Sequence, residues 1–219
     1  MFRFFEKKKK LVPASPGSLW GGYYGVKNSE KVLKEKGEVL GDLLAEKAAP
    51  ASLDQLQTFF RMAIDDSGTD KEIKSRLSSI SEAEWKDVRQ EFLFFYLYVI
   101  GHMSVQYIEI KKAEYFSDQL RLRAGVAYIF VDGLPQRYSD EPMQLLMKSY
   151  NERAVLYDKT RGLLGANKES EDSTLHEFGR YLSMMLLGIE DSTTILTVKT
   201  VALKYLLPLE VPQLLTGKP

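Results

Sequence analysis

A chain of 219 residues has the length of one domain, or of one domain with an added arm. It is 44% hydrophobic and 27% charged, which excludes a wholly disordered chain because enough apolar surface exists to offset the entropy lost on ordering. Thirty Lys and Arg residues balance thirty Asp and Glu residues, so we do not expect nucleic-acid binding. The absence of cysteine excludes disulfides, thiolate nucleophiles and cysteine-ligated metals.

Residues 1–27 predict an irregular and partly disordered N-terminal arm, ahead of a helical domain over residues 28–219. No apolar segment of signal-peptide length follows the opening charges, so we expect a cytoplasmic protein. Aromatic and basic side chains stand together at the start of the arm, and they are Phe2, Phe4, Phe5, Lys7, Lys8, Lys9 and Lys10. Such a cluster is a candidate for weak peripheral contact with an anionic membrane or with a partner, and a solvated tail is the alternative.

From residue 28 onward, apolar residues recur at spacings of three, four and seven, which predict helices. The stretch Ser52–Gln55 has the pattern of a capping box and predicts the start of a second helix. The polar turn at residues 65–69 predicts the end of that helix. Asp70 then predicts the N-cap of a short third helix.

A second capping box begins at Ser81 and opens the strongest helical pattern, which we expect to run from Ser81 to Lys112. Residues 92–101 are apolar on all sides, which predicts that this helix is the buried centre of the fold. Only seventeen residues separate Glu91 from Glu109, at the lower limit for crossing a bilayer. We therefore expect a core helix and no transmembrane segment.

Residues 125–132 permit two interpretations, because β-branched and aromatic residues flanked by glycine are also typical of a buried strand in an α+β fold. No second strand is predicted nearby, and a lone strand cannot satisfy its own backbone, so a helix is favoured. Further helices are expected to begin at Ser139, Thr174 and Ser192, with Gly188 as a C-cap. The predicted fold is mostly α: a single globular domain of about seven helices around a long apolar central helix.

The two histidines are the first candidates for chemistry. Helical di-metal sites place a glutamate three residues before a histidine, but Val99 and Ser173 occupy those positions, so no metal or cofactor is predicted. We interpret His102 as a histidine of the core or of an interface. In the alternative, His102 lines a ligand pocket with polar neighbours from the same helix, namely Tyr96, Gln106 and Tyr107.

No Gly-x-Ser-x-Gly elbow, P-loop or dinucleotide fingerprint is present in the sequence. Because apolar helices are abundant, the leading hypothesis is a helical interaction module that acts through a partner protein or through self-association. One alternative is a helical ligand-binding protein or enzyme with a pocket near His102. A second alternative is a peripheral membrane-associated protein that uses its aromatic and basic N-terminus. Whether the protein is an enzyme stays open.

Overall fold

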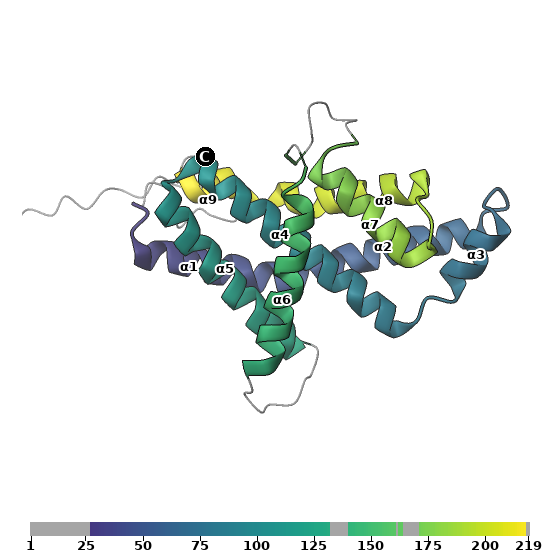
Figure 1. Ribbon diagram of the computed structural model, residues 1–219, viewed down its shortest axis with the longest axis horizontal. Coiled ribbons are helices and arrows are strands. Elements are labelled where there is room, and N and C mark those ends of the chain that lie inside the picture. Colours follow the sequence, from purple (N-terminus) through teal and green to yellow (C-terminus); the bar gives the residue numbers. More distant parts are fainter. Residues whose placement is uncertain (1–26, 132–139, 161, 164–170, 218–219) are drawn as a thin grey trace, which may run out of the picture.

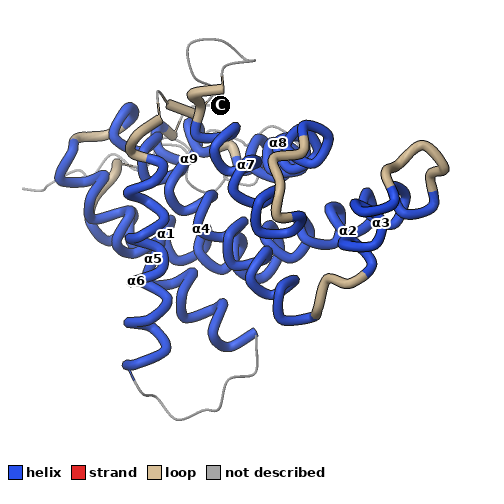
Figure 2. Tube along the Cα trace, turned by 45° about the vertical axis from the view of Figure 1, so that its right-hand side comes forward, coloured by secondary structure: helices blue, strands red, loops and turns tan. Residues whose placement is uncertain are grey.

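The computed structural model describes residues 27–131, 140–160, 162–163 and 171–217. Helices are the only regular secondary structure over these residues (Figure 2). In chain order they are α1 (Glu30–Leu43), α2 (Ala49–Asp65), α3 (Lys71–Ser78), α4 (Glu82–Tyr107), α5 (Ile110–Val131), α6 (Asp140–Tyr157), α7 (Thr174–Leu187), α8 (Ser192–Leu206) and α9 (Val211–Thr216). The predicted mostly-α globular class is confirmed. The alternative strand near residues 125–132 is wrong as far as Val131, because that stretch continues α5.

Helix α4 lies at the centre of the molecule and contacts α2, α5, α6, α7 and α9 (Figure 1). Each of the six residues from Phe92 to Leu97 is at most 1% exposed, so the helix is buried on every side there. This confirms the sequence-based expectation for the apolar stretch. A helix with neighbours packed around its whole circumference needs apolar side chains on every face.

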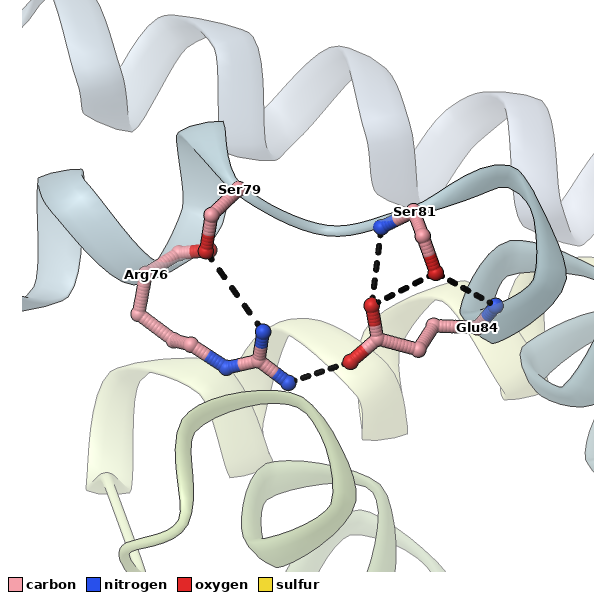
Figure 3. Close-up of polar contacts among 4 residues, drawn as sticks. All are labelled: Arg76, Ser79, Ser81 and Glu84. Atoms are coloured by element: carbon pink, nitrogen blue, oxygen red, sulfur yellow. Dashed lines mark hydrogen bonds and ion pairs between the residues drawn. The ribbon is translucent and has the colours of Figure 1, made fainter.

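The start of α4 has the predicted capping box and is tied to α3 (Figure 3). The Ser81 hydroxyl accepts a hydrogen bond from the Glu84 backbone N–H at 3.3 Å, and the Ser81 backbone N–H donates to the Glu84 carboxylate at 2.8 Å. The same carboxylate pairs with Arg76 of α3. The bond from Ser81 and the contact with Arg76 lower the pKa of Glu84 to about 2, so this carboxylate stays ionised at neutral pH.

The central helix ends earlier than predicted. It was expected to reach Lys112, but Ile108 has extended backbone angles (φ −138°, ψ 162°) and the chain reverses into α5. The apolar spacing runs across this break because Ile110 falls in phase with α4, although its side chain is 63% exposed and packs into no core. The reversal places α5 beside both α4 and α1 (Figure 1).

Helices α1 and α2 are joined by a π-helical turn, Leu44–Ala48, and no break separates them. Pro50 cannot donate the backbone hydrogen bond that an α-helix requires, and a π-turn just before it accommodates that loss. The predicted helix start at Ser52 is therefore wrong. Ser52 is buried inside α2, where its hydroxyl donates to the carbonyl of Ala48 at 2.7 Å and lies 2.6 Å from the Tyr96 hydroxyl.

The structure agrees to within one residue with the helix boundaries predicted at Asp70, Thr174, Gly188 and Ser192. Gly188 ends α7 with a φ of 73°, a left-handed conformation that glycine adopts without strain. Asp70 caps α3, and its carboxylate accepts a hydrogen bond from the Glu72 backbone N–H at 2.7 Å. Ser173 caps α7 and Asp191 caps α8, each one residue before the predicted position. Ser139 lies outside the described residues.

Candidate functional site

A cavity of about 480 Å³ opens where α4, α5 and α6 meet. Its walls combine aromatic rings, carboxylates and one guanidinium, and the residues that define it here are Tyr98, His102, Glu114, Asp118, Arg121 and Asp158. We call it the His102 cleft.

The cleft begins where α4 leaves the core. Ile100 is fully buried, whereas the His102 side chain is exposed. His102 is therefore not a histidine of the core, and its place in an interface stays a prediction. Gly101 lets α5 approach closely here, because a Cβ atom at this position would lie 3.3 Å from the Ser117 hydroxyl oxygen. Tyr98 lies one turn before His102, and the two rings stack with centroids 5.8 Å apart and an interplanar angle of 19°.

A hydrogen bond crosses from α4 to the end of α6. The Tyr98 hydroxyl donates to the Asp158 carboxylate at 2.9 Å. Burial raises the pKa of Tyr98, and the bond to Asp158 raises it further, because ionised Tyr98 would face a carboxylate. Tyr98 therefore stays protonated at neutral pH and acts as a hydrogen-bond donor rather than as a base. Asp158 is itself exposed to solvent.

Arg121, the one guanidinium among the described residues that border the cleft, is already engaged within the protein. Arg121 forms an ion pair with Asp118, one turn earlier on α5. The guanidinium also lies 5.5 Å from the centre of the Tyr150 ring, and Tyr150 is buried at 6% exposure. These contacts fix the orientation of Arg121 along the wall and leave little of its charge for a ligand.

A second and smaller cleft, of about 140 Å³, adjoins the His102 cleft. Three residues border both clefts: Tyr98, His102 and Asp158. Gln106 and Thr174 line only the smaller one. The Tyr98–Asp158 hydrogen bond therefore joins two residues that border both clefts.

The structure brings some of the predicted pocket residues together and separates others. His102 and Gln106 border a cleft, but Tyr96 is fully buried in the core, where its hydroxyl contacts Ser52. Tyr107 is 38% exposed at the end of α4 and borders none of the described cavities. The aromatic and basic cluster at residues 2–10 lies outside the described residues.

Sequence reasoning missed five residues of the site: Tyr98, Glu114, Asp118, Arg121 and Asp158. Tyr98 lies within the apolar stretch 92–101, a pattern that predicts a place in the core. Its spacing of four residues from His102 was the only available signal that both rings share one face. The other four lie on α5 or directly after α6, and no local pattern indicates that they meet α4.

An apolar groove of about 640 Å³ separates α7 from α8. Leu196 and Leu207 are 64% and 70% exposed along it. His176, the second histidine, lies at one side of this groove, and Lys199 and Glu171 place charges of both signs on its walls. The groove is thus much less polar than the His102 cleft.

In the described ranges no three His, Cys, Asp or Glu side chains are grouped so that they could hold a metal ion. None of the described helices combines the length and the apolar character needed to cross a membrane. Comparison with known proteins finds no matching family model, no matching curated protein and no matching solved structure.

Proposed function

We propose that the protein is a helical binding protein that takes a small organic molecule in the His102 cleft. The observation that supports this proposal is the cleft itself. Its volume of about 480 Å³ falls within the range of small-molecule sites, and three helices supply its walls. Aromatic faces, a hydroxyl donor and carboxylate acceptors together can orient a ligand that carries both apolar and polar groups.

The walls are held in place by the core beneath them. Phe94 of α4 packs edge-on against Tyr150 of α6, with ring centroids 5.8 Å apart. Tyr98 packs against the buried ring of Tyr157 at 5.1 Å. Because aromatic contacts of this kind fix side-chain rotamers, a ligand would pay little ordering entropy on binding.

A fragment screen followed by ¹H–¹⁵N NMR spectra tests the proposal. Ala154 borders the cleft, so Ala154→Met fills part of it, whereas Val155→Met adds the same side chain at a 59% exposed position on the same helix. We expect fragments to shift signals of wall residues in the wild type and in Val155→Met. Ala154→Met should weaken their binding by about tenfold. Fragments that bind only outside the cleft, or that bind Ala154→Met as tightly as the wild type, would contradict the proposal.

The α7–α8 groove favours a second candidate, the interaction module. Here the proposed occupant is a second copy of the chain, because one surface bears exposed leucines together with Lys199 and Glu171. A two-fold contact needs such a self-complementary surface. Sedimentation velocity of Leu196→Glu tests it, with Thr193→Glu on the same helix as the control. A wild type that stays monomeric at high concentration would exclude this candidate.

The cytoplasmic location and the membrane contact of residues 2–10 stay predictions. Cell fractionation tests the first. Liposome sedimentation at low and high salt, with and without residues 2–10, tests the second.

A further inference from the structure

We propose that the ligand of the His102 cleft is a small organic cation whose ammonium group binds Asp158 beside the aromatic pair of Tyr98 and His102. This inference rests on the proposed function and names the chemical class of its ligand. The charge of the walls, the engagement of the one guanidinium and the aromatic pair each favour a cation.

The first argument is the charge balance of the walls. Three carboxylates, Glu114, Asp118 and Asp158, face one guanidinium, Arg121, which pairs with Asp118. The hydrogen-bond donor to Asp158 is the neutral Tyr98 hydroxyl, which leaves the carboxylate charge in place. Glu114 has no ion pair within the described part of the chain. Two of the three carboxylates, Asp158 and Glu114, therefore have no Lys or Arg partner among the described residues, and their field attracts a cation.

The second argument concerns anions. Arg121 is the only Lys or Arg that borders the cleft among the described residues, and its guanidinium already contacts Asp118 and the Tyr150 ring. A carboxylate or phosphate ligand would have to displace Asp118 from Arg121. It would also lie near the charges of Asp158 and Glu114. Both requirements disfavour an anion in this cleft.

The third argument is the aromatic pair beside Asp158. The Tyr98 hydroxyl lies 2.9 Å from the carboxylate, so the ring and the acceptor form adjacent parts of one wall. The His102 ring stacks on Tyr98 and extends this apolar wall by one helical turn. An ammonium group can donate to Asp158 while its carbon substituents lie against the rings, which combines a charge-assisted hydrogen bond with a cation–π contact.

A titration with three compounds that share one ring tests the ligand class. Benzylamine, benzyl alcohol and benzoate have similar size but carry a positive charge, no charge and a negative charge at neutral pH. We expect benzylamine to shift the NMR signals of wall residues and to bind about tenfold more tightly than the other two at equal ionic strength.

Matched variants test the position of the ammonium group. Asp158→Asn should weaken benzylamine binding by about fivefold or more, because it removes one of the two uncompensated charges. Glu152→Gln removes a carboxylate from an exposed position on α6 that borders neither cleft, and it should change the affinity by less than about twofold. Tyr98→Phe keeps the ring and should retain binding, whereas Tyr98→Leu should weaken it by about threefold.

The outcomes separate this inference from the proposed function. If benzyl alcohol or benzoate binds the cleft as tightly as benzylamine, the inference of a cationic ligand is wrong and the proposed binding function stands. If benzylamine binds with equal affinity to Asp158→Asn, or if none of the three compounds binds, the inference is also overturned. The binding function itself fails only if the fragment screen finds no ligand that Ala154→Met displaces.

Discussion

A buried ion pair joins α4, α6 and α7, and removal of its cation should destabilise the protein in a pH-dependent way. Glu91 is 5% exposed and accepts two hydrogen bonds of 2.8 Å from Arg153. The Arg153 guanidinium also lies 3.7 Å from the centre of the Tyr181 ring and donates to its hydroxyl at 2.6 Å. Burial raises the pKa of Glu91, and Arg153 opposes that rise. Arg153→Met keeps an apolar stem and removes the opposing charge.

The size of the effect follows from the proton that Glu91 must then bind. A carboxyl with an unfolded pKa of about 4.3 costs about 3.7 kcal/mol to hold protonated at pH 7 and about 1 kcal/mol at pH 5. Leaving the buried carboxylate ionised and unpaired would cost a similar amount, about 3–5 kcal/mol. Above pH 4.3 the unfolded variant releases a proton that the folded variant retains, so its stability falls as the pH rises.

We therefore expect Arg153→Met to lower the free energy of unfolding by about 3–4 kcal/mol at pH 7, and by about 2–3 kcal/mol less at pH 5. Urea unfolding followed by circular dichroism measures both values. The double variant Glu91→Gln with Arg153→Met should lose the pH dependence. Arg180→Met breaks the more exposed pair with Glu177 and should cost less than about 1 kcal/mol at either pH. Equal losses for Arg153→Met at the two pH values would refute the reasoning.

Three further changes test other contacts by the same unfolding assay. Tyr96→Phe removes a buried hydroxyl 2.6 Å from that of Ser52, so we expect the free energy of unfolding to fall by about 1–2 kcal/mol. If Ser52→Ala lowers that free energy as much in Tyr96→Phe as in the wild type, the two hydroxyls are not coupled. Gly41→Ala would place a Cβ atom 2.9 Å from a backbone nitrogen of α5, so we expect a loss of at least about 2 kcal/mol, whereas Gly68→Ala, in an open turn, should cost less than about 1 kcal/mol. Burial lowers the pKa of Lys36 in the folded protein to about 8, whereas the pKa of a lysine in the unfolded chain is about 10.4. Between these two pKa values the unfolded chain binds more protons than the folded protein, so the free energy of unfolding should rise with pH there. Lys36→Met should abolish this rise, and an unchanged profile would contradict it.

Features that depend on a few neighbouring residues could be predicted from the sequence. The capping box at Ser81 needs only four residues, and the end of α7 at Gly188 needs only a residue that tolerates a positive φ. The buried centre of α4 was predictable because residues 92–97 have no polar face to present to water. In each case the local signal and the tertiary environment favour the same structure.

Prediction was wrong where packing determines the outcome. The capping pattern at Ser52 is genuine as a pattern, but the buried Tyr96 hydroxyl needs a hydrogen-bond partner and the Ser52 hydroxyl supplies it from within a continuous helix. For the site, the rarity of histidine was enough to single out His102. Its partners could not be identified in this way, because Tyr98 and Asp158 are sixty positions apart in the chain.

The reversal at Ile108 is what makes the cleft possible. Had α4 continued through the predicted end at Lys112 and on to Asp118, sixteen residues at a rise of 1.5 Å would place Asp118 about 24 Å from His102 along one axis. The extended backbone at Ile108 turns α5 back beside α4, so that both residues border the same cavity. The side chains of the site are thus ordinary residues, most of them on α4 and α5, with Asp158 directly after α6. Their chemistry as a group arises from a two-residue interruption between the two helices, which the hydrophobic periodicity does not reveal.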